Sequence, residues 1–282
     1  MGYGIINVCF SCDDYYAKYA GVAIASILLN ANDDDEFYFW ILDNGISENT
    51  KIRIERLKSI RYFDLRYIGN NSKDYKLKFA QLLPKTDRII YLDSDIIVKK
   101  SLSGLYNINL DNSFIAGVTD KNANNKQTVM NYLNTGVMLI DLNKIRQYGV
   151  ENKFAQYAKM HNINTEINSA CVINNVLSKY TKTIDGNWNV QVANFMDRSS
   201  YTKTPDIIHY TGKQKPWLFG TYNYFKKEYF KVLKHTPWAI STDEQLKWGV
   251  WNNICSVAHF LIDNPQFIIR TEFWQALFKT IS

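Results

Sequence analysis

The stretch of sequence that decides the fold reads Arg88-Ile89-Ile90-Tyr91-Leu92-Asp93-Ser94-Asp95-Ile96-Ile97-Val98. Two aspartates, Asp93 and Asp95, stand here between two apolar runs of the kind that form buried strands. Two unpaired carboxylates held close together repel each other, and a hard cation removes that repulsion. Because Mg²⁺ and Mn²⁺ prefer carboxylate and phosphate oxygens, the pattern predicts a divalent metal site at the end of a strand.

Strand-like and helix-like segments alternate on the N-terminal side of this stretch. We predict strands over 5–11, 36–42, 65–68 and 88–92, separated by helices over 20–29, 48–60 (capped by Ser47) and 76–83. Such alternation is typical of an α/β protein with a parallel sheet and helices on both faces. Ligands of these sheets bind at the carboxyl ends of the strands. Further along we predict a strand over 137–142, a helix over 150–161 and a strand ending at His209.

Length and composition describe an ordinary globular chain. Its 282 residues suit one large domain with a small appendage, and 46% apolar against 21% charged residues exclude a disordered chain. The net charge of +6 comes without a nucleic-acid motif, so we expect no nucleic-acid partner. The N-terminus shows no basic segment followed by an apolar one, so we expect no signal peptide. We also expect no spanning helix, because the longest uncharged run near the C-terminus, 248–262, is too short to cross a membrane.

The cysteine pattern includes a C-x-x-C pair, Cys9 and Cys12. A structural zinc site needs four ligands, and no second pair of Cys or His residues accompanies this one. The pair also lies in an apolar run that we predict to be a buried strand. We therefore expect buried, reduced thiols and a reducing cytoplasmic location.

A second polar cluster runs from His209 to Trp217 and reads His-Tyr-Thr-Gly-Lys-Gln-Lys-Pro-Trp. A neutral His is a good ligand for Mn²⁺, Gly212 permits close approach of the backbone to an anion, and Lys215 can meet phosphate charge. The chain lacks the usual glycine-rich phosphate-binding motifs, and this cluster would then bind the phosphates instead. A buried His beside a turn with solvated lysines is the alternative.

Taken together, the motifs make the chain resemble the family-8 retaining glycosyltransferases, above all the bacterial galactosyl- and glucosyltransferases that build lipopolysaccharide and other surface glycans. The matching segments follow the family's order over residues 5–220 and comprise 10–16, 42–47, 91–95, 133–142, Trp188-Asn189 and 209–217. The resemblance implies a GT-A fold, Mn²⁺ (or Mg²⁺) as cofactor, a UDP-sugar as donor, and transfer of a hexose such as glucose or galactose with retention of the anomeric configuration.

The resemblance also assigns roles to individual residues. It implies a metal held by Asp93, Asp95 and His209, and a carboxylate on the acceptor side at Asp120. The positions that match the family's donor-binding residues are Ser11, Asp13, Lys76, Asp93, Ser94, Asn134, Thr135, Gly212 and Lys215. For Trp188 and Trp217 we favour packing over stacking on a sugar ring.

One stretch departs from the family. Where members usually carry an Asp-Gln-Asp triplet on the sugar face, this chain has Ser169-Ala170-Cys171. Three interpretations remain open: an active enzyme in which Glu166, Asn168 or Ser169 orients the sugar, an impaired protein that binds UDP-sugar without efficient transfer, or a register shifted by a few residues. Smaller departures are Lys76, where an Arg is common, and Tyr15.

The C-terminal part differs in composition from the rest. We predict a catalytic domain over 1–221 and an aromatic, Lys-rich appendage over 222–282. Rings interleaved with lysines suit an anionic membrane surface, and the alternative is a helical cover with its rings in the core. The resemblance implies that the acceptor is a glycan or glycolipid. We expect the protein to be cytoplasmic and peripheral to the inner face of the membrane.

Overall fold

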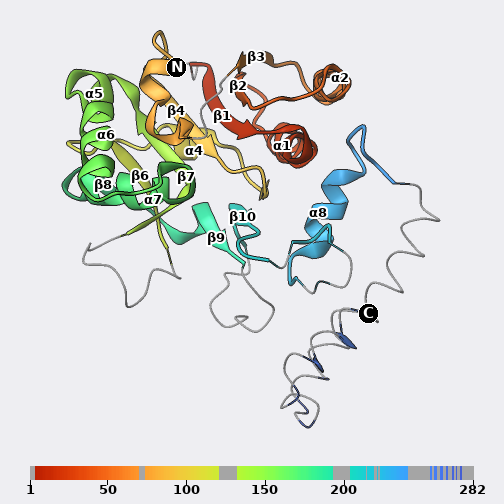
Figure 1. Cartoon of the computed structure of the whole chain (residues 1–282). Coiled ribbons are helices and arrows are strands. Elements are labelled where there is room, and N and C mark those ends of the chain that lie inside the picture. Colours follow the sequence, from red (N-terminus) through yellow and green to blue (C-terminus); the bar gives the residue numbers. More distant parts are fainter. Residues whose placement is uncertain are drawn as a thin grey trace. The chain divides into compact units, whose positions relative to one another are not determined.

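A computed structural model describes residues 4–69, 74–120, 132–192 and 204–240, without 214, 219, 220 and 222, together with isolated residues between 255 and 274 (Figure 1). The chain divides into two compact units, Met1–Gln191 with Thr202–His209 and Val192–Tyr201 with Tyr210–Ser282. The predicted boundary between 221 and 222 stays a prediction.

The first unit opens with the predicted strand–helix alternation. Its first elements are β1 (Ile6–Cys12), α1 (Asp14–Leu29), β2 (Phe37–Asp43), α2 (Glu48–Glu55), η1 (Arg56–Ser59), β3 (Asp64–Gly69), η2 (Tyr75–Leu77), α3 (Phe79–Leu82) and β4 (Arg88–Leu92). Helix α1 begins six residues earlier than predicted, because the Asp13 carboxylate accepts from the Tyr16 N–H and caps it. The helix predicted over 76–83 is two short helical pieces, with Lys78 at φ −131° between them.

The later elements are less regular, as the sequence indicates. They are β5 (Ile96–Val98), α4 (Ser103–Tyr106), β6 (Ile115–Thr119), β7 (Leu133–Asp141), α5 (Leu142–Gln147), α6 (Val150–Met160), α7 (Thr165–Val176), η3 (Ser178–Tyr180), β8 (Thr181–Thr183), η4 (Gly186–Asn189), β9 (Val190–Gln191) and β10 (Ile207–His209). Strand β7 starts four residues before the predicted 137–142.

The main sheet has seven strands in the order β3-β2-β1-β4-β7-β6-β8, and β7 runs antiparallel to both of its neighbours. A small second sheet has the order β5-β10-β9. In it β10 pairs antiparallel with β5 and sets His209 opposite Ile96. This pairing carries His209 next to Asp95, although the two residues are far apart in the sequence. The predicted α/β class with a largely parallel sheet is confirmed.

Alternate residues of β4 face opposite sides of the sheet, as the two-residue period of a strand requires. Ile89 and Tyr91 join a buried cluster with Phe154 of α6 and Val172 of α7. Cys9 and Cys12 of β1 are free and buried, and burial raises the pKa of the Cys12 thiol to about 12. Both thiols are therefore structural at neutral pH, as predicted.

The described part of the second unit contains helix α8 (Lys226–Leu233). Its Tyr229 and Val232 are buried, whereas Lys227 and Lys231 are exposed. The ring of Trp217 lies 5.2 Å from that of Tyr229, so this tryptophan packs, as predicted. Most of the predicted appendage beyond residue 240 lies outside the described residues. No helix among the described residues has both the length and the apolar character needed to cross a membrane.

Candidate active site

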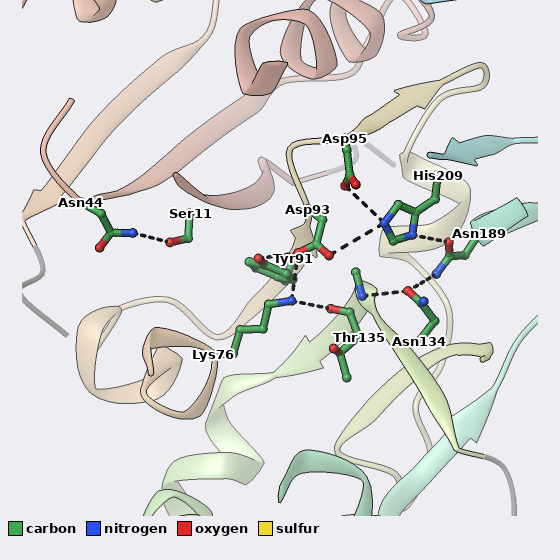
Figure 2. Close-up of polar contacts among 11 residues, drawn as sticks. Ser11, Asn44, Lys76, Tyr91, Asp93, Asp95, Asn134, Thr135, Asn189 and His209 are labelled. Carbon is green, nitrogen blue, oxygen red and sulfur yellow. Dashed lines mark hydrogen bonds and ion pairs between the residues drawn. The ribbon is translucent and has the colours of Figure 1, made fainter. Parts of the chain in front are cut away.

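Three potential metal ligands meet where the two sheets adjoin. Asp93 directly follows β4, Asp95 directly precedes β5, and His209 ends β10. The His209 Nε2 atom lies 3.3 Å from Asp95 Oδ1 and 3.8 Å from Asp93 Oδ2 (Figure 2). One ligand atom from each residue lies within 4.8 Å of the others. The structure thus brings together the three ligands that the sequence predicts.

Gly136 of β7 lies directly against this cluster. A Cβ atom built on Gly136 would lie 2.3 Å from His209 Cε1 and 2.7 Å from Asp93 Oδ2. A Cβ atom needs more than 3 Å from other heavy atoms, so at this position only glycine fits. The two carboxylates and the imidazole of the cluster are a donor set suited to Mg²⁺ or Mn²⁺.

The other oxygen of Asp93 is held from the opposite side. Asp93 Oδ1 accepts hydrogen bonds from Lys76 Nζ at 2.9 Å and from the Tyr91 hydroxyl at 2.7 Å. Burial lowers the pKa of Lys76, but Asp93 together with Tyr75 and Asp95 raises it by more, so this pKa lies above the ordinary value. Lys76 Nζ also lies 4.8 Å from the centre of the Tyr91 ring. These contacts orient Asp93 so that its Oδ2 faces His209.

Two asparagine side chains hold the His209 ring on its Nδ1 side, away from the two aspartates. His209 Nδ1 lies 3.0 Å from Asn189 Oδ1, and Asn189 Nδ2 donates to Asn134 Oδ1 at 3.1 Å. Asn134 Oδ1 also accepts from the backbone N–H of Gly136. Sequence reasoning placed Asn134 at the donor sugar and assigned no role to Asn189, although the Trp188-Asn189 motif contained it.

A cavity of about 440 Å³ opens beside the two aspartates, a size that suits a small ligand. It is lined by Ser11, Cys12, Asp13, Tyr16, Asn44, Tyr75, Asp93, Ser94 and Asp95. Ser11, Asp13 and Ser94 are predicted donor residues, and the Ser11 hydroxyl accepts from Asn44 Nδ2 at 3.1 Å. The sequence missed Tyr16 and Tyr75 as lining residues, and nothing in their local pattern singles them out.

A comparison with known families now identifies the chain. Residues 7–221 match the family described as Glycosyl transferase family 8. The chain belongs to glycosyl transferase family 8. The match covers the described site residues from Ser11 to His209, and with them the whole metal cluster.

Relatives of this family-8 chain include General stress protein A of Bacillus subtilis, 24% identical over 271 residues that cover 83% of this chain and 95% of that protein. The lipopolysaccharide 1,2-glucosyltransferase of Escherichia coli K12 is 24% identical over 267 residues, covering 83% and 79%. Among solved structures, galactosyltransferase LgtC with donor and acceptor sugar analogs has a TM-score of 0.70 at 20% identity, covering 86% of this chain and 100% of that one. This likeness establishes the GT-A fold.

The altered triplet of this family-8 chain lies on α7, which is kinked at Asn168 (φ −118°, ψ 29°). Asn174 ties the helix to the start of β7, because its amide bonds both the N–H and the C=O of Leu133 and also the C=O of Ala170. Ala170 therefore lies close to Leu133, next in sequence to Asn134. Asn168 is exposed, Ser169 is half-buried, and the side chain of Glu166 lies outside the described residues.

Replacing Asn174 by Ala should destabilise the first unit. Asn174 is 2% exposed, and its loss would leave the N–H and C=O of Leu133 without partners. We expect the free energy of unfolding to fall by about 2–3 kcal/mol, measured by urea denaturation. Asn175→Ala is the matched control, because among the described residues the Asn175 side chain bonds Cys171 of its own helix. Equal losses in both variants would contradict the proposed anchor.

The remaining predicted residues are divided between the two units. Gly212 and Lys215 belong to the second unit. Gly212 has φ +73°, a conformation that favours glycine, and the Lys215 ammonium donates to the Tyr210 carbonyl. Asp120 follows β6, and its backbone N–H bonds the Tyr132 carbonyl at 2.8 Å. Their roles at phosphate and acceptor stay predictions. Trp188 is 8% exposed and packs beside Gly104, which agrees with the packing interpretation.

Proposed function

We propose that this family-8 protein is a metal-dependent, retaining glycosyltransferase that transfers a hexose, glucose or galactose, from a UDP-sugar. The observation that carries the proposal is the cluster of Asp93, Asp95 and His209, whose two aspartates line the 440 Å³ cavity. A cavity with acidic ligands at one end and polar strand-end residues, Ser11 and Asp13, along its wall suits a nucleotide diphosphate held through a cation.

We assign the cation as Mn²⁺, because an imidazole nitrogen is a poorer ligand for Mg²⁺ than for a transition metal. Once bound, the ion would neutralise charge that develops on the departing diphosphate. The chain's own residues fix the geometry: Lys76 and Tyr91 hold one oxygen of Asp93 and leave the other to the cation. Ser11, Asp13 and Asn44 offer hydrogen-bonding groups for the nucleoside along the cavity wall.

The proposed activity can be tested by incubating the protein with Mn²⁺ and either UDP-glucose or UDP-galactose and measuring the release of UDP. We expect release with one of the two donors, faster with a lipopolysaccharide-type acceptor and abolished by EDTA. The Asp93→Asn variant measures the background. Binding of UDP-sugar without release, with acceptors offered, would instead support a protein that binds the donor without transferring it.

The triplet Ser169-Ala170-Cys171 bears on the rate. A front-side mechanism, in which the acceptor attacks the face that UDP leaves, needs no protein nucleophile, so the triplet is compatible with transfer. Ala170 offers the sugar no hydrogen bond, and Ser169, Asn168 or Glu166 would orient it instead.

Ala170→Gln should therefore raise the transfer rate, because the new amide restores a hydrogen bond at the sugar face. One such bond contributes about 1 kcal/mol, or about fivefold in kcat. Steady-state kinetics at saturating donor would measure the gain. An unchanged kcat would show that another group already orients the sugar.

The acceptor we propose is a surface glycan or glycolipid, because a relative of this chain is a lipopolysaccharide 1,2-glucosyltransferase. The four free cysteines suit the reducing cytoplasm, where we place the protein. Attachment to an anionic membrane would use the exposed lysines of the second unit, Lys227 and Lys234 among them.

This attachment predicts that Lys227→Gln and Lys234→Gln weaken binding to vesicles of anionic phospholipid by about fivefold each, since a lysine near such a surface contributes about 1 kcal/mol. Co-sedimentation at low salt would measure it. Lys58→Gln, on η1 of the first unit, is the control. Equal binding of all variants to the vesicles would contradict the proposed membrane contact.

A further inference from the structure

A series of hydrogen bonds, which we call the relay, runs from the backbone of β7 to the Nδ1 side of the His209 ring (Figure 2). The Gly136 N–H donates to Asn134 Oδ1 at 3.0 Å, Asn189 Nδ2 donates to the same oxygen at 3.1 Å, and Asn189 Oδ1 lies 3.0 Å from His209 Nδ1. Asn189 is 1% and His209 3% exposed, so water has little access to exchange with these partners. The relay ends on the ring whose other nitrogen faces the two aspartates.

The Gly136 N–H, the first donor of the relay, decides which group donates and which accepts in each of these hydrogen bonds. A backbone N–H can only donate, so the atom of Asn134 that meets it must be the amide oxygen. That oxygen can only accept, so Asn189 must turn its NH₂ group toward it. The other end of Asn189, which meets His209, is then its oxygen, and an oxygen requires a proton on His209 Nδ1.

We infer that Asn134 and Asn189 are positioning residues that hold His209 as the Nδ1–H tautomer, so that Nε2 keeps its lone pair and points it at the site formed with Asp93 and Asp95. The inference rests on the proposed function for the metal, but the tautomer exists without one. Metal-binding histidines depend on such partners, which fix the ring's orientation and tautomer.

Asn134 gains a second role from this arrangement. Its Oδ1 belongs to the relay that ends on His209, while its Nδ2 takes no part in it. By resemblance, the same residue lies at the donor sugar. A contact between sugar and Asn134 would therefore act on the side chain that orients a metal ligand, which couples donor and metal binding through one amide.

The decisive experiment is ¹⁵N NMR of the imidazole rings in metal-free protein. The chain has four histidines, and His209 is assigned by the signals that disappear in His209→Gln. At a pH where the His209 ring is neutral, we expect its proton on Nδ1 and an unprotonated Nε2. A neutral ring with its proton on Nε2, or a mixture of both tautomers, would overturn the inference.

Two Asn134 variants separate the relay from other effects. Asn134→Asp keeps an oxygen that can accept from both Gly136 and Asn189, so we expect the Nδ1–H tautomer and Mn²⁺ affinity no weaker than wild type. Asn134→Leu and Asn189→Leu break the relay, and we expect mixed tautomers and about 10–100-fold weaker Mn²⁺ binding by calorimetry. If Asn189→Leu does not fold, the Asn134 pair alone decides. Equal loss in both Asn134 variants would refute the relay.

Failure of the inference differs from failure of the proposed function. Wild-type protein that shows the Nδ1–H tautomer and binds no Mn²⁺, with or without UDP, would refute the metal assignment and leave the relay standing. A variant with both relay asparagines changed that binds Mn²⁺ as well as wild type does would refute the relay and leave the metal assignment standing.

Discussion

Gly136→Ala should abolish metal-dependent donor binding while the fold persists. The new Cβ would lie 2.3 Å from His209 Cε1 and 2.7 Å from Asp93 Oδ2, so at least one of the two ligands must move. We expect Mn²⁺ binding to weaken by about 100-fold or more, a larger loss than the one expected for replacing Asn134 or Asn189. UDP release should fall to background.

Calorimetry with Mn²⁺ and UDP, together with thermal unfolding, would measure this effect. Gly69→Ala is the matched control, because Gly69 also lies in a strand of the main sheet and a Cβ there meets nothing within 4 Å. The control should bind Mn²⁺ like wild type. Normal Mn²⁺ binding by Gly136→Ala would mean that the cation lies elsewhere.

Asp93→Asn should remove metal binding and also destabilise the protein, for two separate reasons. The substitution takes away one anionic ligand of the cluster, and it leaves the Lys76 ammonium without its partner at 2.9 Å. The Lys76 side chain is only 13% exposed, so water cannot replace the carboxylate. We expect a loss of about 2–3 kcal/mol in the free energy of unfolding, less than the loss at a fully buried pair, because Asp93 is 30% exposed.

A second substitution separates the two effects. Adding Lys76→Met to Asp93→Asn removes the stranded charge and should recover most of the stability, measured by urea denaturation, but none of the Mn²⁺ binding. The single variant Lys76→Met should keep measurable Mn²⁺ binding. A double variant as unstable as Asp93→Asn alone would show that Lys76 does not depend on Asp93 for its burial.

Much of the fold could be predicted from local pattern. The apolar run 88–92 became β4, and Ser47 caps α2, because strand burial and helix capping depend on near neighbours in the sequence. Local pattern failed where capping or a break was not obvious, as at Asp13, which starts α1 early, and at Lys78, which interrupts the helix predicted over 76–83.

The candidate site was predictable only in part, because its members lie far apart in the sequence. The spacing of Asp93 and Asp95 predicts a cation site, but Tyr16, Asn44 and Tyr75 reach the cavity only through the packing of α1, β2 and η2. Gly136 looked like one residue of a strand, and only the distances to Asp93 and His209 show why a side chain is excluded there.

The sequence by itself determined the α/β class, the family and the chemical kinds of ligand, since these depend on residue types in a fixed order. Only the tertiary structure decided which groups face one another. The pairing of β10 with β5 brings His209 to Asp95. The packing around Asp93 turns one oxygen to Lys76 and the other to His209. Hydrogen-bond polarity is a property of contacts in space, so the tautomer of His209 could be read only from its neighbours.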